Sequence, residues 1–160
     1  MALHLVRENS DFQIYAPIVM NAEVIAYKGE FESIRTLGMG QKREHLKSLA
    51  IEKNINIGSI SEISPSSLPY ALETDLVDGI VLDISKASLL KEYSFVPLSD
   101  MPYISFSLVL RKDIINTQEF SQFISYYNEA VDLLNNEDYL KDILDIDSLN
   151  NLDIKFLNLE

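Results

Sequence analysis

Over residues 36–43 the sequence reads Thr36-Leu37-Gly38-Met39-Gly40-Gln41-Lys42-Arg43. This run predicts an apolar strand that passes into a helix, with two glycines and two cations at the junction. Backbone N–H groups at a helix start lack intrahelical partners, glycine admits a close approach, and the helix dipole adds partial positive charge. Such a junction suits a small anion, and Lys42 and Arg43 would reinforce its field. Because neither the Walker spacing nor the full dinucleotide fingerprint is present, an ordinary turn with solvated cations stays open as the alternative.

Strand and helix patterns alternate on both sides of this junction. Aliphatic and β-branched runs predict strands over Ala22–Tyr27, Ile34–Leu37, Ile55–Ile60, Val77–Asp83 and Phe106–Arg111. Periodic apolar residues predict helices over Gln41–Lys53, Pro65–Thr74, Ser85–Leu90 and Phe120–Leu134. Ser64 before Pro65 is typical of a helix N-cap, and Asn116 with Glu119 is typical of a capping box. After Asn135 the chain is acidic and polar, and we expect a small helix followed by irregular chain.

This alternation predicts an α/β fold, a three-layer sandwich in which helices cover both faces of a mostly parallel sheet. Ligands of such sheets bind at the carboxyl ends of the strands. In this sequence those ends are the turn over residues 38–43, the loop over 59–64 and the loop over 83–85. The sequence therefore predicts that these three segments converge on one crevice.

The composition excludes several classes of function. The chain has 25 acidic and 13 basic side chains in 160 residues, a formal net charge of -12, which would repel a phosphate backbone. We therefore expect no nucleic acid partner. The absence of cysteine excludes thiolate catalysis and sulfur-based zinc sites, and the apolar runs are too short to cross a bilayer. Residues 1–8 lack the basic start and apolar core of a secretory signal, so we expect a cytoplasmic protein or, by preference, a trimmed form of a longer one.

No residue identifies itself as catalytic or metal-binding. His4 and His45 do not have the spacing of zinc ligands, and a lone exposed helix histidine is the preferred interpretation of His45. Carboxylate pairs such as Asp75 and Asp78 are interpreted as solvated loop charge, because acid–base pairs need opposed placement around a substrate. The sequence also lacks the Gly-x-Ser-x-Gly elbow of a nucleophilic serine. We predict no catalysis, no metal and no cofactor.

Four segments, taken in order, indicate a known family. They are Pro17–Met20 with Ala22–Lys28, then Leu68–Glu73, Val77–Asp83 and Ser107–Asp113. This succession resembles the substrate-binding proteins of ABC transporters, in the type 2 periplasmic-binding superfamily. The resemblance covers roughly residues 17–135. It implies that one strand, Ala22–Lys28, carries the chain from a first lobe to a second, and that a later strand, Ser105–Lys112, brings it back.

The resemblance also implies a division of the chain and a function. Residues 1–27 would be an incoming segment and crossing strand, 28–104 a ligand-binding lobe, and 105–160 a return strand, long helix and acidic tail. The function would be non-catalytic capture of a small anionic or zwitterionic molecule by closure of two lobes, followed by delivery to a membrane permease. Such a protein is periplasmic or otherwise extracytoplasmic, and membrane-associated at full length. The signal segment of that family is not among these residues.

Ligand contacts are implied at the helix start, where the family often binds an anionic group. The predicted ligand-binding residues are Gly38, Gly40, Gln41, Lys42 and Arg43, with Ser61, Ser64 and Asp83 as secondary candidates. For Ser64 a capping role is preferred, because Pro65 follows it directly. Asp83 would fix a ligand amine or cap the next helix, and the cap is again preferred.

Two other functions stay open on the same fold. An effector-sensing regulatory domain of a bacterial transcriptional regulator would have a helix-turn-helix upstream. A small-molecule enzyme, such as a transferase, would need an acid or base with a displaced pKa in the crevice. The sequence upstream of these residues would separate all three.

Overall fold

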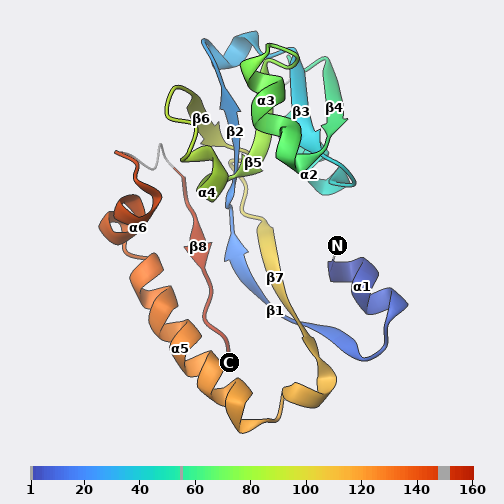
Figure 1. Ribbon diagram of the computed structural model, residues 1–160, viewed down its shortest axis with the longest axis vertical. Helices are drawn as coiled ribbons and strands as arrows, with labels where there is room; N and C mark the ends of the chain where they lie inside the picture. Colours follow the sequence, from blue (N-terminus) through green and yellow to red (C-terminus); the bar gives the residue numbers. More distant parts are fainter. Residues whose placement is uncertain (1, 55, 148–151) are drawn as a thin grey trace. The chain divides into compact units, whose positions relative to one another are not determined.

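The chain forms two compact units (Figure 1). The computed structural model describes residues 2–54, 56–147 and 152–160. Unit 1 takes in Met1–Met20, Tyr103–Ile143 and Ile154–Glu160, and unit 2 takes in Asn21–Pro102 and Leu144–Asp153. Each unit has its own sheet.

Unit 2 is built on a five-stranded sheet in the order β4-β3-β5-β2-β6. The strands are β2 (Glu23–Tyr27), β3 (Thr36–Gly40), β4 (Ser59–Ile63), β5 (Gly79–Asp83) and β6 (Ser94–Pro97). β3 pairs in parallel with β4 and β5, whereas β2 pairs antiparallel with β5 and β6. Four of the five strands therefore run in one direction, which confirms the predicted mostly parallel sheet.

Helices follow the parallel strands, as the sequence predicts. They are α2 (Glu44–Lys53), α3 (Leu68–Glu73) and α4 (Ile84–Ala87), with 3-10 turns over Phe31–Ser33 and Pro65–Ser67. In the sheet, β4 and β5 lie on opposite sides of β3. The connection from β3 to β4 therefore runs one way across the sheet, and the connection from β4 to β5 runs the other way and passes β3. Because such crossovers are right-handed, α2 and α3 lie on opposite faces of the sheet. The faces of the sheet are closed to water at its centre, since Ile25, Leu37 and Ile80 are fully buried.

Several predicted boundaries in unit 2 are wrong; the strand predicted over Ile34–Leu37, for example, is β3 at Thr36–Gly40. Two of the others have a local cause. α2 begins at Glu44 and not at Gln41, because Lys42 adopts a left-handed backbone conformation with φ 59° that a right-handed helix cannot contain. β4 begins at Ser59, since the N–H groups of Gly58 and Ser59 both bind the carbonyl of Arg35 and pairing starts there. The strand predicted over 55–60 is thus displaced, and its first residue lies outside the described residues.

Two predicted helix caps also differ from the structure. Ser64 makes no side-chain cap, because a 3-10 turn over Pro65–Ser67 comes before α3, and its hydroxyl lies 3.1 Å from that of Ser66. At the long helix α5 (Gln118–Leu134) the cap is Thr117, one residue after Asn116, and its hydroxyl accepts the N–H of Phe120 at 3.2 Å. Both helices themselves are present.

Unit 1 contains a three-stranded antiparallel sheet in the order β7-β1-β8. Its strands are β1 (Phe12–Met20), β7 (Ile104–Arg111) and β8 (Lys155–Phe156), and its helices are α1 (Ala2–Glu8), α5 and most of α6 (Glu137–Leu144), with a 3-10 turn over Lys112–Ile114. The aromatic stripe predicted α5 and the acidic tail predicted α6. The prediction of irregular chain after α6 is wrong over Lys155–Phe156, because these two residues form β8 and pair with Val19 and Met20.

α5 is fixed to the sheet of unit 1 by two asparagines that lie two helical turns apart. The Asn128 amide both donates to and accepts from the backbone of Leu159 at 2.8 Å. The Asn135 amide does the same with the backbone of Phe156 at 2.9 Å. Each side-chain amide satisfies a backbone N–H and a backbone carbonyl that a neighbouring strand would otherwise satisfy. α5 therefore lies alongside the C-terminal segment (Figure 1).

Asp78 joins the starts of β3 and β5. Its carboxylate accepts the N–H of Arg35 at 2.9 Å, the N–H of Thr36 at 2.8 Å and the hydroxyl of Thr36 at 2.8 Å. The two backbone hydrogen bonds are the main reason that the pKa of Asp78 lies below its ordinary value. Asp78 is therefore a structural residue, and the interpretation of its charge as merely solvated is wrong.

We predict that Asp78→Asn lowers the free energy of unfolding at neutral pH by about 1 kcal/mol, since charged hydrogen bonds at an exposed site are lost. A lowered pKa in the folded state stabilises it above the ordinary carboxyl pKa of 3.8, and this contribution disappears as the pH falls through the lowered value. Urea unfolding across this pH range should show the two proteins converging in acid. Asp75→Asn is the control, because asparagine tolerates the left-handed backbone there (φ 55°). A difference that persists in acid would contradict this role.

Candidate functional site

The carboxyl edge of the unit 2 sheet gathers most of the predicted ligand-binding residues. β3, β4 and β5 are parallel and end at Gly40, Ile63 and Asp83, so the segments that follow them lie at one edge. Gly40 to Arg43, Ser64 and Asp83 therefore share this edge. Gly38 and Ser61 do not, because they pair with each other inside β3 and β4, two residues before the strands end.

The turn between β3 and α2 is exposed and positively charged. Gln41, Lys42 and Arg43 are all exposed, and Arg43, the N-cap of α2, supplies no side-chain cap to the helix amides. Within the described part of the chain, neither Lys42 nor Arg43 forms an ion pair. The first amides of α2 and two exposed cations thus lie together at this edge.

Glu62, on the neighbouring strand β4, has its carboxylate beside the same turn. Its carboxylate binds the ammonium of Lys47 at 2.6 Å, and Lys47 also binds Glu44 at 2.8 Å. The hydrogen bond from Lys47 and its charge lower the pKa of Glu62, with a smaller contribution from the backbone N–H of Lys42. The three cations of this cluster, Lys42, Arg43 and Lys47, still outnumber its two carboxylates by one.

Gly38 and Gly40 differ in what surrounds them. A Cβ at Gly38 would lie 3.1 Å from Ile80 and 3.2 Å from both Ile63 and Leu68, so packing of α3 on the sheet requires a glycine. A Cβ at Gly40 would meet only Pro65 at 3.6 Å and the Arg43 side chain at 3.9 Å, which are ordinary contacts. Neither glycine has a positive φ. Packing explains Gly38 without a ligand, whereas nothing in the protein's own packing requires glycine at position 40.

Asp83 ends β5 and begins α4, but its side chain does not cap that helix. Its carboxylate accepts the hydroxyl of Ser85 and binds the ammonium of Lys86 at 2.5 Å. Burial raises its pKa, and the bonds to Lys86 and Ser85 outweigh that effect, so the pKa of Asp83 lies below its ordinary value. Its register partner across the sheet is Glu23, which is buried, whereas Asp83 itself is partly exposed. Asp83 therefore presents a negative charge at the same edge.

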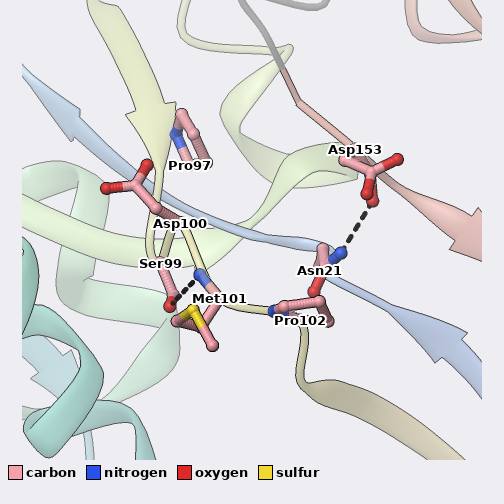
Figure 2. A pocket seen from close by; sticks show the side chains of 7 residues that line it. All are labelled: Asn21, Pro97, Ser99, Asp100, Met101, Pro102 and Asp153. Carbon is pink, nitrogen blue, oxygen red and sulfur yellow. Dashed lines mark hydrogen bonds between the residues drawn. The ribbon is translucent and has the colours of Figure 1, made fainter.

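A pocket of about 140 Å³ lies at this edge as well, and the sequence did not predict it (Figure 2). It is lined by Asn21, Pro97, Ser99, Asp100, Met101, Pro102 and Asp153. β6 runs in the same direction as β5 and ends at Pro97, whereas β2 runs the opposite way and begins just after Asn21. The alternating run Ser94–Pro97, followed by polar residues, is the only sequence signal that could have indicated this pocket.

Three polar interactions organise the wall of the pocket. The amide of Asn21 donates to the carbonyl of Asp153 at 2.8 Å, and the hydroxyl of Ser99 accepts the N–H of Met101 at 3.0 Å (Figure 2). Asp100 forms an ion pair with Lys53 at the end of α2. These bonds hold the segment after β6 in place. The pocket is therefore surrounded by both hydrogen-bond donors and hydrogen-bond acceptors.

The described residues do not form a cluster that could hold a metal ion. Among the described residues, no cluster of three or more histidines, aspartates or glutamates has the arrangement of a metal site. His45 lies exposed on α2. None of the helices described is both long and apolar enough to cross a membrane.

Solved structures with the same arrangement of elements are substrate-binding proteins. The ligand binding component of an ABC-type import system from Staphylococcus aureus, solved with zinc bound, aligns with a TM-score of 0.62 at 15% identity, over 99% of this chain and 65% of that chain. The periplasmic aliphatic sulphonate binding protein of Escherichia coli aligns with a TM-score of 0.58 at 16% identity, over 88% and 55%. The chain has the periplasmic-binding-protein fold.

The similarity to proteins with the periplasmic-binding-protein fold is one of structure. The cysteine-binding protein of Campylobacter jejuni also shares it, with a TM-score of 0.52 at 14% identity. No protein-family model matches the chain, and no curated protein matches it by sequence. The chain spans 65% of the length of the Staphylococcus aureus protein, which is less than two thirds.

We predict that Gly38→Ala lowers the free energy of unfolding by about 1–3 kcal/mol, because its methyl group would force Ile80, Ile63 and Leu68 apart. Gly40→Ala carries the same chemical change two residues away and should leave stability unchanged or raise it by up to about 1 kcal/mol. Urea denaturation of both variants measures the difference. Equal destabilisation would mean that the protein's own packing also requires Gly40.

Proposed function

We propose that the chain is the greater part of a solute-binding component of an ABC importer. It holds a small anionic or zwitterionic molecule without changing it chemically and delivers it to a membrane permease. The fold supports this proposal, since the structures that share it include an import-system component, a sulphonate-binding protein and a cysteine-binding protein. The ligand-binding lobe corresponds to residues 28–104, with segments on either side connecting it to unit 1.

The observation that carries the proposal is the glycine at the end of β3, which is buried and which the protein's own packing does not require. Gly40 lies where the chain reaches the edge of the sheet, and a side chain there would fit the protein. Two exposed cations and the uncapped start of α2 follow directly. A glycine that packing does not require, beside a patch of donors and positive charge, suits a ligand that approaches the backbone closely.

Both charges of a zwitterion have a counterpart at this edge. The α2 amides with Lys42 or Arg43 bind a carboxylate, sulfonate or phosphonate group. The Asp83 carboxylate, with its pKa lowered, remains ionised and faces an ammonium group through its neighbour Ser85 or directly. Closure around the ligand strengthens both interactions, because it removes water from them.

The titratable groups at this edge favour binding over catalysis. The two carboxylates with lowered pKa values, Glu62 and Asp83, are each held by a lysine, as in structural ion pairs. A general acid or base at neutral pH needs a pKa displaced toward neutrality instead. This supports a binding protein that does no chemistry.

We propose an extracytoplasmic location for the protein. One structure with the same fold is described as periplasmic and another, from Bacillus subtilis, as a putative methionine-binding lipoprotein. A permease partner in the membrane follows from the same comparison. No contact with nucleic acid is proposed, because the net charge of -12 opposes it.

A ligand screen followed by calorimetry tests the site. Amino acids, organic acids, sulfonates and phosphonates are screened for those that raise the melting temperature of the full-length protein, since a ligand of the folded state stabilises it. We predict that Gly40→Val then weakens binding of the best ligand at least about tenfold, a loss of about 1.4 kcal/mol.

Gly58→Val is the matched control for this experiment. Gly58 lies just before β4, at the opposite edge of the sheet, and a Cβ there would meet only the Arg35 carbonyl at 3.6 Å. The control should bind the ligand as the unmodified protein does. Unchanged affinity in Gly40→Val, or equal losses in both variants, would refute this site.

A further inference from the structure

Glu62 lies on the face of the unit 2 sheet that α2 covers. Its register partner on β3 is Met39, and residues in register on parallel strands point to the same face. Gly38 faces α3, because a Cβ there would lie 3.2 Å from the Leu68 side chain of that helix. Since successive residues of a strand point to opposite faces, Met39 and Glu62 point toward the α2 side. The Glu62 side chain is therefore on the side of the sheet to which the β3–α2 turn leads.

Lys47 holds the Glu62 carboxylate in this position. Its ammonium lies 2.6 Å from Glu62 and 2.8 Å from Glu44, which is in the first turn of α2. The side chain of Lys47 is 22% exposed and that of Glu62 is 40% exposed, whereas that of Glu44 is 77% exposed. Water and salt screen a half-buried charge less than an exposed one. Of the two carboxylates, Glu62 therefore acts more strongly on an anion beside the turn.

The charges around the β3–α2 turn match a ligand group with a single negative charge. The cations Lys42, Arg43 and Lys47 outnumber the carboxylates of Glu44 and Glu62 by one. A monoanionic group neutralises this excess. A dianionic group brings a second negative charge beside the Glu62 carboxylate, in a protein whose net charge is already -12. The second charge is therefore repelled and not attracted.

We propose that Glu62 determines the charge of the ligand group that binds at the β3–α2 turn. The site takes a monoanionic group, such as a carboxylate or a sulfonate, and rejects a dianion, such as a fully ionised phosphonate. This inference rests on the anion site proposed above and narrows its ligand class. Specificity of this kind comes from repulsion of the wrong ligand, here by a carboxylate that Lys47 holds in place.

A purely structural role for Glu62 leads to a different result. The ion pair between Glu62 and Lys47 joins β4 to α2, so loss of the Glu62 charge could simply loosen the helix. A loosened helix start weakens the binding of every anion in the same proportion. Removal of a repelling charge instead changes the ratio of the affinities for a dianion and a monoanion. This ratio therefore separates the two roles.

Titration of the ¹⁵N-labelled full-length protein with methanesulfonate and with sulfate measures the ratio. Both probes have a tetrahedral sulfur, but methanesulfonate carries one negative charge and sulfate carries two. The amide shifts of residues 41–45 report binding at the turn, and the ionic strength is kept constant because salt screens these charges. Glu62→Gln should raise the affinity for sulfate relative to methanesulfonate at least about tenfold, because the repelling carboxylate is removed.

Two further variants serve as controls. Glu137 on α6 in unit 1 also binds a lysine, Lys141, at 2.6 Å, so Glu137→Gln removes the same charge from the protein and should leave the ratio unchanged. Glu44→Gln frees the same lysine as Glu62→Gln does, and it should change the ratio less because Glu44 is more exposed.

The outcomes separate this inference from the proposed site. An unchanged ratio in Glu62→Gln, or an equal change in Glu44→Gln or Glu137→Gln, would overturn the assignment to Glu62. In each of these cases, shifts at residues 41–45 would still support an anion site at the turn. Absence of shifts at these residues with either probe, in the unmodified protein and in Glu62→Gln alike, would overturn the site and this inference together.

Discussion

The parallel pairing of β3 with both β4 and β5 is the constraint on which the rest of unit 2 depends. It places three strand ends, Gly40, Ile63 and Asp83, at one edge of the sheet. Gly38 lets α3 approach β3, and Gly79 lets β5 approach its neighbours, since a Cβ at Gly79 would lie only 3.3 Å from the Ala26 carbonyl and from the Leu37 side chain. Close packing inside the sheet thus determines which loops meet outside it.

The loops that meet at this edge differ in charge. The β3–α2 turn has an excess of one positive charge, in a protein whose net charge is -12, while Asp83 ends the neighbouring strand. A local excess of positive charge in an acidic protein concentrates anions where the backbone amides can bind them. The two units also differ in burial, since most of the buried apolar side chains among the described residues belong to unit 2.

Local sequence patterns predicted the elements but not the contacts between distant residues. The strand over 77–83 and the helix α5 follow from aliphatic runs and an aromatic stripe, and both are present. The start of α2 could not be predicted, because Lys42 has a left-handed backbone that non-glycine residues rarely adopt. The ion pair between Glu62 and Lys47 joins residues of β4 and α2, and the pocket wall joins Asn21 to Asp153. Such contacts depend on the order of the strands in the sheet, and that order cannot be read from the periodicity of apolar residues in the sequence. The predicted site residues at the strand ends share one edge, but ligand contact at each of them stays a prediction.

The central claim is that backbone amides at the β3–α2 turn bind the negatively charged group of a ligand. Titration of the ¹⁵N-labelled protein with the best ligand from the screen, followed by amide chemical shifts, tests it most directly. The account predicts that the largest shifts occur at Gly40 through His45, with smaller ones at Asp83 through Ser85. Shifts confined to other parts of the protein, with the amides of this turn unchanged at saturation, would contradict it.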